Sequence, residues 1–158
     1  MELLKGFKSS PSPENTRAIP GAVFHFLAFG HETENRHSLM KITVQRGAEP
    51  PTHTHSHEDE SYYILKGNIR YTIGEDVVTV NEGEYVYLPN GVPHKFEILG
   101  EIAEVLMWLS PAGLEQWFWD NSVPAPDGKS FPVLQGPPPP HVIDHFVNSL
   151  REYGVEMK

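Results

Sequence analysis

Short apolar segments alternate with polar residues between residues 23 and 109. In the segment 38–45, Met40, Ile42 and Val44 recur at every second position, the period of a strand with one buried face. The same criterion predicts strands at residues 23–29, 38–45, 61–65, 68–73, 77–80, 84–88, 95–99 and 102–109. Because glycine and asparagine turn signals separate these strands, the pattern predicts an all-β fold, either an antiparallel barrel or a sandwich.

After residue 109 the period of the apolar residues changes from two to about 3.6. Ser110 is a good N-cap and Pro111 a good first helical residue, and an apolar stripe through Trp117 follows them. A proline-rich stretch comes next, and residues 141–153 then place their apolar side chains on one helical face before Gly154. The sequence therefore predicts a short helix after the last strand and a second helix near the C-terminus.

These elements predict one domain, since 158 residues suffice for a single buried core. Its parts are an N-terminal arm or edge strand (1–20), a barrel with its short helix (21–120), a proline-rich connector (121–140) and a C-terminal helix (141–158). The apolar face of the C-terminal helix needs a surface to pack against. That surface is either the open end of the barrel or a partner subunit, and we expect a homodimer.

Charge and composition exclude several classes of partner. A formal net charge of −9 and a pI near 5.4 argue against nucleic acid or an anionic membrane, which require a concentrated basic surface. The chain has no cysteine, which excludes disulfides, thiolate ligands and a cysteine nucleophile. No apolar run reaches the length of a signal or membrane segment, so we expect, by default, a cytoplasmic protein with a small-molecule substrate.

Two blocks, residues 47–67 and 83–94, carry the candidate chemistry. Side chains two apart on an extended strand point the same way, so His53 and His55 can reach one metal ion. Four residues then allow a turn that returns Glu60 beside them, and one face of a hairpin would supply three ligands. His94, at the start of a distant strand, would supply the fourth.

The two blocks resemble the two motifs of the cupin superfamily, G(X)5HXH(X)3-4E(X)6G and G(X)5PXG(X)2H(X)3N. Every fixed position of the first motif is met, and the second is met except at its end, where Ile98 replaces asparagine. The resemblance implies a jelly-roll barrel with a metal site. The implied ligands are His53, His55, Glu60 and His94. A finer similarity, over about residues 36–120, is to small cupins of the quercetin 2,3-dioxygenase-like group.

Three imidazoles and one carboxylate leave one or two coordination positions open, which favours catalysis over a purely structural metal. Such a site accepts Fe, Mn, Ni, Co, Cu or Zn as a divalent ion. The resemblance to quercetinases implies that Glu60 could also take a proton from the substrate. We therefore expect a metal-dependent dioxygenase. The alternatives are a redox-neutral isomerase, cyclase or lyase, and a cupin that binds a small molecule without turnover.

Strand parity predicts the wall of the substrate site. Tyr62 and Ile64 share the parity of Glu60, and Phe96 and Ile98 share that of His94, so all four should face the interior. This wall suits an apolar or aromatic substrate, with the Tyr62 hydroxyl as a polar handle. His57 shares the parity of the two earlier histidines, but acidic residues after it suggest a turn. We expect it at the mouth of the site or behind the ligands.

Overall fold

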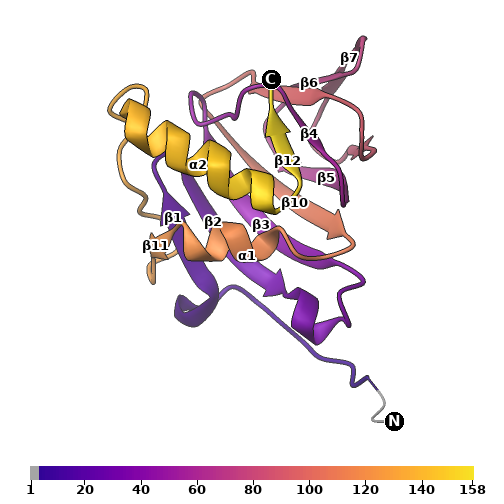
Figure 1. Ribbon diagram of the computed structural model, residues 1–158. Coiled ribbons are helices and arrows are strands. Elements are labelled where there is room, and N and C mark those ends of the chain that lie inside the picture. The colour runs from indigo at the N-terminus through magenta and orange to yellow at the C-terminus, as the bar shows by residue number, and fades with distance from the viewer. Residues whose placement is uncertain (1–3) are drawn as a thin grey trace.

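Two antiparallel sheets face one another in the computed structural model, which describes residues 4–158 (Figure 1). The larger sheet has the order β11 (Val123–Pro124), β1 (Thr16–Ile19), β2 (Ala22–Ala28), β3 (Ser38–Gln45), β10 (Ile102–Ser110), β5 (Asp59–Lys66) and β8 (Tyr85–Leu88). The smaller sheet has the order β12 (Val155–Met157), β4 (His53–His55), β9 (His94–Ile98), β6 (Ile69–Ile73) and β7 (Asp76–Val80). This architecture confirms the predicted antiparallel jelly roll.

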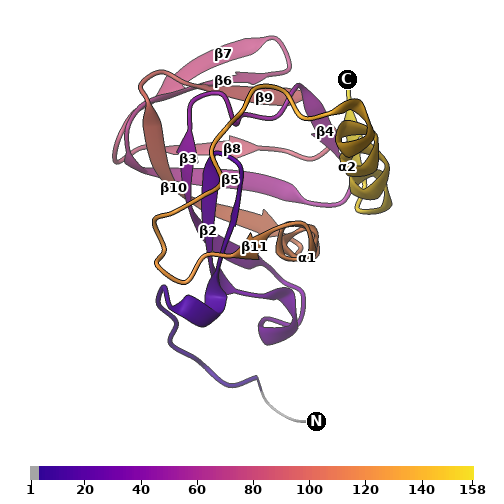
Figure 2. The same cartoon turned by 90° about the vertical axis from the view of Figure 1, so that its left-hand side faces the viewer.

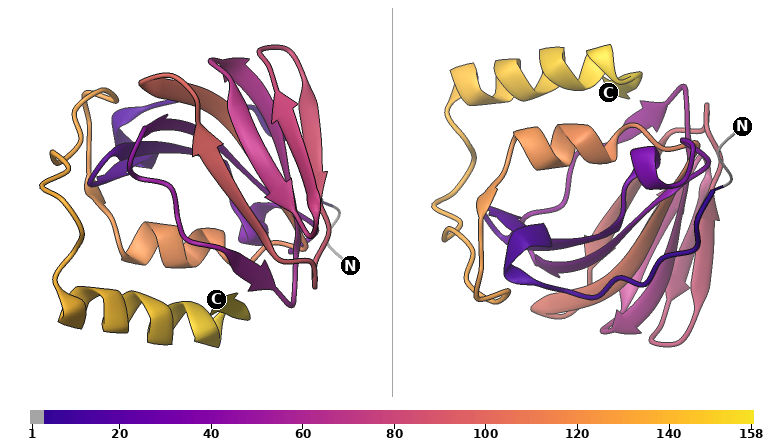
Figure 3. Two further views of the ribbon diagram at one scale, coloured as in Figure 1. Left: turned by 90° about the horizontal axis from the view of Figure 1, so that it is seen from above. Right: turned by 90° about the horizontal axis from the view of Figure 1, so that it is seen from below.

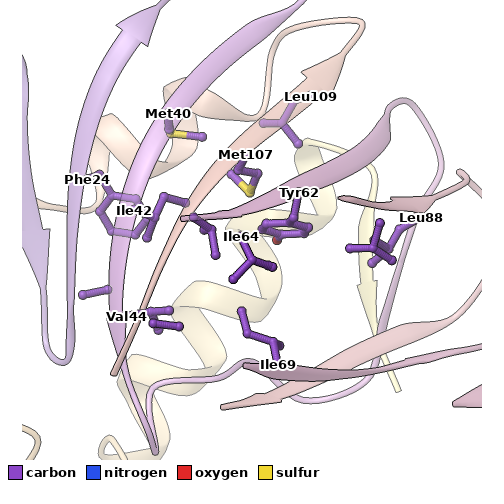
Figure 4. Close-up of a cluster of buried hydrophobic side chains, with 14 of the residues drawn as sticks. Phe24, Met40, Ile42, Val44, Tyr62, Ile64, Ile69, Leu88, Met107 and Leu109 are labelled. Atoms are coloured by element: carbon purple, nitrogen blue, oxygen red, sulfur yellow. The ribbon is translucent and has the colours of Figure 1, made fainter. Parts of the chain in front are cut away.

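Alternating burial explains why the strands form a sandwich. Along β3 every second residue is buried, so Met40, Ile42 and Val44 point between the sheets. The buried side chains of both sheets meet there, as Figure 4 shows for Phe24, Met40, Ile42, Val44, Tyr62, Ile64, Ile69, Leu88, Met107 and Leu109. Burial of each large apolar side chain contributes about 1.5–3 kcal/mol to the free energy of unfolding. The inner faces of the sheets thus form the core, and the candidate site lies on the same faces.

The two predicted helices are present as α1 (Glu115–Asp120) and α2 (Pro140–Glu152), and two 3-10 turns are η1 (Pro13–Asn15) and η2 (Gly30–Glu32). Helix α2 runs alongside α1 (Figures 2 and 3), and the rings of Trp117 and Phe146 meet with centroids 5.5 Å apart. Within residues 4–158, no helix is long and apolar enough to cross a membrane. The C-terminal helix therefore has a packing surface within its own chain.

The predicted N-cap of the first helix is wrong. Ser110 is the last residue of β10, where it pairs with Asp59, and its hydroxyl donates a hydrogen bond to the carbonyl oxygen of Arg36 at 3.0 Å. The helix begins only at Glu115, with no side-chain cap at Leu114. Ser110 does not cap the helix because it pairs with β5 and extends β10 by one residue beyond the predicted strand end.

Both ends of the chain add strands to the sheets. Of the expected arm, residues 16–19 form β1 between β2 and β11, and residues 1–3 lie outside the described part. Strand β12, which the sequence pattern did not predict, pairs with β4, with Val155 opposite His55 and Met157 opposite His53. The C-terminal strand therefore flanks the strand that carries two of the candidate ligands.

Candidate metal centre

The four candidate ligands come together between the sheets. Each of them offers one ligand atom, and these four atoms all lie within 4.8 Å of one another. All four are buried, with exposed fractions from 2% for His55 and His94 to 4% for Glu60 and 7% for His53. The structure thus brings together the donor set that the two sequence blocks predicted.

The ligands come from both sheets, so the predicted three-ligand hairpin is wrong. Strand β4 carries His53 and His55 and lies beside β9, where His94 stands directly opposite His53. Strand β5, which carries Glu60, belongs to the other sheet and pairs with β10 and β8. The turn between β4 and β5 therefore crosses from one sheet to the other. The centre forms where the two sheets face each other.

Hydrogen bonds behind the imidazoles fix their tautomers. His53 Nδ1 lies 2.8 Å from the carbonyl oxygen of Pro51, and His94 Nδ1 lies 3.1 Å from that of Val92. Carbonyl oxygens only accept hydrogen bonds, so both Nδ1 atoms carry the proton. His55 Nδ1 donates in the same way to the buried carboxylate of Glu58. Each ring therefore keeps the lone pair of its Nε2 atom for a metal.

Unpaired nitrogen atoms show that these residues fit a metal ion. The Nε2 atoms of His55 and His94 are buried and have no hydrogen-bond partner among residues 4–158. They lie 3.8 and 3.2 Å, respectively, from the same oxygen, Oε2 of Glu60. A buried polar atom without a partner is costly, and imidazole nitrogens with a carboxylate suit divalent transition metals. The donor set therefore fits one such ion.

The centre is arranged to keep its carboxylate ionised. Burial raises the pKa of Glu60, but the close approach of His94 Nε2 to its carboxylate and the electrostatic influence of the three histidines outweigh burial and lower the pKa to about 2. Burial lowers the pKa of His53, so its neutral form is favoured. Burial also acts to lower the pKa of His55, but Glu58 and Glu60 outweigh it and raise that pKa. An ionised carboxylate among imidazoles attracts a cation.

An apolar cavity of about 180 Å³ opens at the centre, and His53, His55 and Glu60 are part of its lining. Tyr62 and Phe96, two of the predicted wall residues, also line it, whereas Ile64 and Ile98 lie fully buried in the surrounding core. Residues that follow the barrel strands in the sequence, in α1, α2, β12 and the residue before α1, form the rest of this wall: Leu114, Trp117, Phe118, Leu150, Val155 and Met157. The C-terminal segment thus helps to enclose the space beside the ligands.

The residue behind His55 is Glu58, which the sequence analysis treated only as a turn signal. Glu58 is 3% exposed and bonds to His55 Nδ1, whereas His57 is exposed. Strand parity cannot reveal this role because Glu58 lies in the turn between β4 and β5. An acidic residue three positions after a candidate metal-ligating histidine would have been the usable sequence signal.

We expect Glu58→Gln to weaken metal binding by about 10–100-fold, because the neutral amide no longer stabilises the orientation and basicity of His55. Competition with a chromogenic chelator measures the affinity, and circular dichroism checks the fold. Glu82→Gln, at an exposed acidic position, is the matched control and should bind metal as the unmodified protein does. Equal affinities for all three proteins would show that Glu58 does not support the centre.

Comparisons with known proteins agree on the fold. The family model described as cupin domain matches residues 40–109. The uncharacterized protein SCO3923 of Streptomyces coelicolor is 30% identical over 108 residues, which cover 68% of this chain and 97% of that protein.

Two solved structures have the same fold. KdgF from Halomonas sp. has a TM-score of 0.62 at 16% identity, over 71% of this chain and 99% of that chain. A Bacillus subtilis oxalate decarboxylase, OxdC, has a TM-score of 0.55 at 25% identity, over 69% of this chain and 31% of that chain. The likeness to KdgF concerns the fold alone.

Proposed function

This chain belongs to the cupin superfamily, and we propose that it is a metal-dependent dioxygenase acting on a small, largely apolar or aromatic substrate that bears oxygen. One observation carries the proposal: three histidines and a glutamate converge beside an apolar cavity, and His53, His55 and Glu60 are part of its lining. Four protein ligands would leave one or two positions open on a five- or six-coordinate ion, and the cavity beside the ligands offers space for a substrate. A purely structural ion would be enclosed by its ligands.

The lining of the cavity supports the substrate class. In the described part of the chain, no lysine, arginine, asparagine or glutamine lines it. A small dianion would therefore find no side-chain counter-charge apart from the metal centre. The rings of Tyr62, Tyr71 and Phe96 instead offer aromatic surface, with centroids 5.5 to 6.2 Å apart. These features favour an uncharged substrate with an enol or phenol oxygen.

The residues around the centre support proton transfer. A bound divalent ion supplies Lewis-acid chemistry, which lowers the pKa of a substrate hydroxyl, and a redox-active ion also supplies dioxygen chemistry. Glu60 is ionised at neutral pH and accepts the proton from that hydroxyl. Tyr62 donates a hydrogen bond to Glu60 Oε1 at 2.8 Å and holds the carboxylate in place. Burial raises the pKa of Tyr62 well above its usual value, so this donor keeps its proton.

A redox-neutral reaction is the second candidate. Proton transfer to Glu60 and Lewis-acid activation need no dioxygen, and together they suit an isomerase, a cyclase or a lyase. The structural likeness to an oxalate decarboxylase supports a redox-neutral reaction as the alternative. In the third candidate function, binding without turnover, the protein keeps the cavity and forms no product.

The test is oxygen uptake by protein reloaded separately with Fe(II), Mn(II), Ni(II), Co(II), Cu(II) or Zn(II). We expect at least one member of a panel of flavonols, β-diketones and catechols to cause uptake of one dioxygen per substrate consumed, with both oxygen atoms in the product. Glu60→Gln should abolish this uptake, whereas Tyr63→Phe, at a 38% exposed position on β5, should leave it unchanged.

A matched anaerobic run separates the three candidates. Product formation that proceeds equally well without oxygen would reject the dioxygenase and support the redox-neutral enzyme. Binding of panel members without any product, under both conditions and with all six metals, would support the non-catalytic binding protein.

A further inference from the structure

The hydroxyl of Tyr71 is an unpaired polar atom in the cavity lining. Tyr71 lies on β6 and is 0% exposed, and its hydroxyl has no hydrogen-bond partner among residues 4–158. Among residues 4–158, the other fully buried, unpaired atom of the lining is Nε2 of His55, and the unpaired Nε2 of His94 belongs to the adjacent ligand cluster. Burying a hydroxyl without a partner is unfavourable, whereas phenylalanine would fill the same space at no such cost. The unpaired hydroxyl therefore indicates a ligand that accepts its hydrogen bond.

Strand register places Tyr71 one side-chain layer away from the metal centre. In the β6–β9 ladder, His94 stands opposite Ile73 and Phe96 stands opposite Tyr71. Two residues along a strand correspond to about 7 Å. Across the sandwich, Tyr62 follows Glu60 by the same two residues on β5. The three rings of Tyr62, Tyr71 and Phe96 thus form an aromatic layer next to the layer of ligands.

The other hydrogen-bond donors near this layer already have partners. The Tyr62 hydroxyl donates to Glu60, and the indole nitrogen of Trp117 donates to the hydroxyl of Ser149 at 2.9 Å. Burial and the charge of Glu60 raise the pKa of Tyr71 well above its usual value, so its hydroxyl keeps its proton. Tyr71 is therefore a donor available to a molecule in the cavity.

We infer that the substrate carries a second oxygen, separate from the one held at the metal centre, which accepts a hydrogen bond from the Tyr71 hydroxyl. The inference rests on the proposed function, since it assumes that the substrate is bound at the metal. It narrows the substrate class to an uncharged molecule with a metal-binding enol or phenol oxygen and an acceptor, such as a carbonyl, about one side-chain layer away. Tyr71 is thus a specificity-determining residue.

The experiment compares two probes of similar shape on Zn(II)-loaded protein, where no oxygen chemistry occurs. The first, 4-hydroxyacetophenone, has a phenol and a distant carbonyl acceptor, and 4-isopropylphenol lacks the acceptor. Calorimetry gives the ratio of the two affinities for the unmodified protein and for Tyr71→Phe. We expect the substitution to lower the preference for the ketone by roughly three- to tenfold, the effect of one neutral hydrogen bond. Tyr63→Phe should keep the original ratio.

Stability without a probe supplies a second measurement. Because the hydroxyl is unpaired, Tyr71→Phe should keep its metal, and its Tm should stay unchanged or rise by roughly 2–4 °C. A clear fall in Tm would show that the hydroxyl has a partner within the protein and would overturn the inference.

A ratio of affinities that Tyr71→Phe leaves unchanged would also overturn the inference, and so would a lack of binding of both probes to the Zn(II)-loaded protein. Failure of the proposed function is distinguishable, because it appears as missing metal or missing turnover and not in the ratio of probe affinities.

Discussion

Replacing His55 with alanine is expected to lower the metal content of the purified protein from about one divalent ion per chain to a small fraction of that value. His55 offers one of the four candidate ligand atoms, and its Nε2 has no hydrogen-bond partner within the described residues. Loss of a residue behind a ligand already costs about 10–100-fold in affinity, so loss of a ligand should cost more. The fold should persist because β4 is held to β12 and β9 through its backbone.

Elemental analysis of freshly purified protein measures this effect, and circular dichroism follows the fold. Alanine at position 55 leaves the buried carboxylate of Glu58 without its partner, so Glu60→Gln is a second variant that keeps this pair intact. His141→Ala removes an exposed histidine and should retain the metal. If the unmodified protein bound no stoichiometric metal, even after reloading with each of the six ions, the proposed metal-dependent function would be rejected.

Ile98→Asn, which places the residue of the cupin motif at this position, is expected to lower the free energy of unfolding by about 3 kcal/mol or more. The side chain of Ile98 is 2% exposed and belongs to the core cluster, opposite Ile69 in the ladder. Asparagine removes apolar burial worth about 1.5–3 kcal/mol and leaves a buried amide that costs about 1–3 kcal/mol when unpaired. For a chain of this length, Tm should fall by roughly 6–12 °C.

Thermal unfolding of the metal-loaded protein checks this expectation, with Ile98→Val as the control. Valine keeps an apolar side chain, so it should cost only about 0.5–1.5 kcal/mol. The affinity of the asparagine variant for apolar phenols should change little because Ile98 does not line the cavity. Small loss of stability with altered probe affinity would place the side chain in the cavity wall, where the sequence analysis expected it.

Local sequence patterns were sufficient for most of the central strands and for the set of candidate ligands. The alternation of Met40, Ile42 and Val44 predicted a strand with the bounds of β3, because a two-residue period requires only a sheet with one buried face. The residue types in the two blocks also predicted the buried cluster of His53, His55, Glu60 and His94, although the hairpin inferred from their spacing is wrong. Residue types and distances along the chain carry this information, whichever strands later become neighbours.

The partners of each strand were decided by the tertiary structure. The sequence placed Glu60 on a hairpin with His53, but β5 pairs in the larger sheet, and the centre closes across the sandwich. The three residues of β12 are too few to show a period, yet they pair with β4. Glu58 became a candidate through its burial and its hydrogen bond with His55, and Tyr71 through its burial and the missing partner of its hydroxyl. Such properties depend on contacts between segments far apart in the chain, which no local pattern encodes.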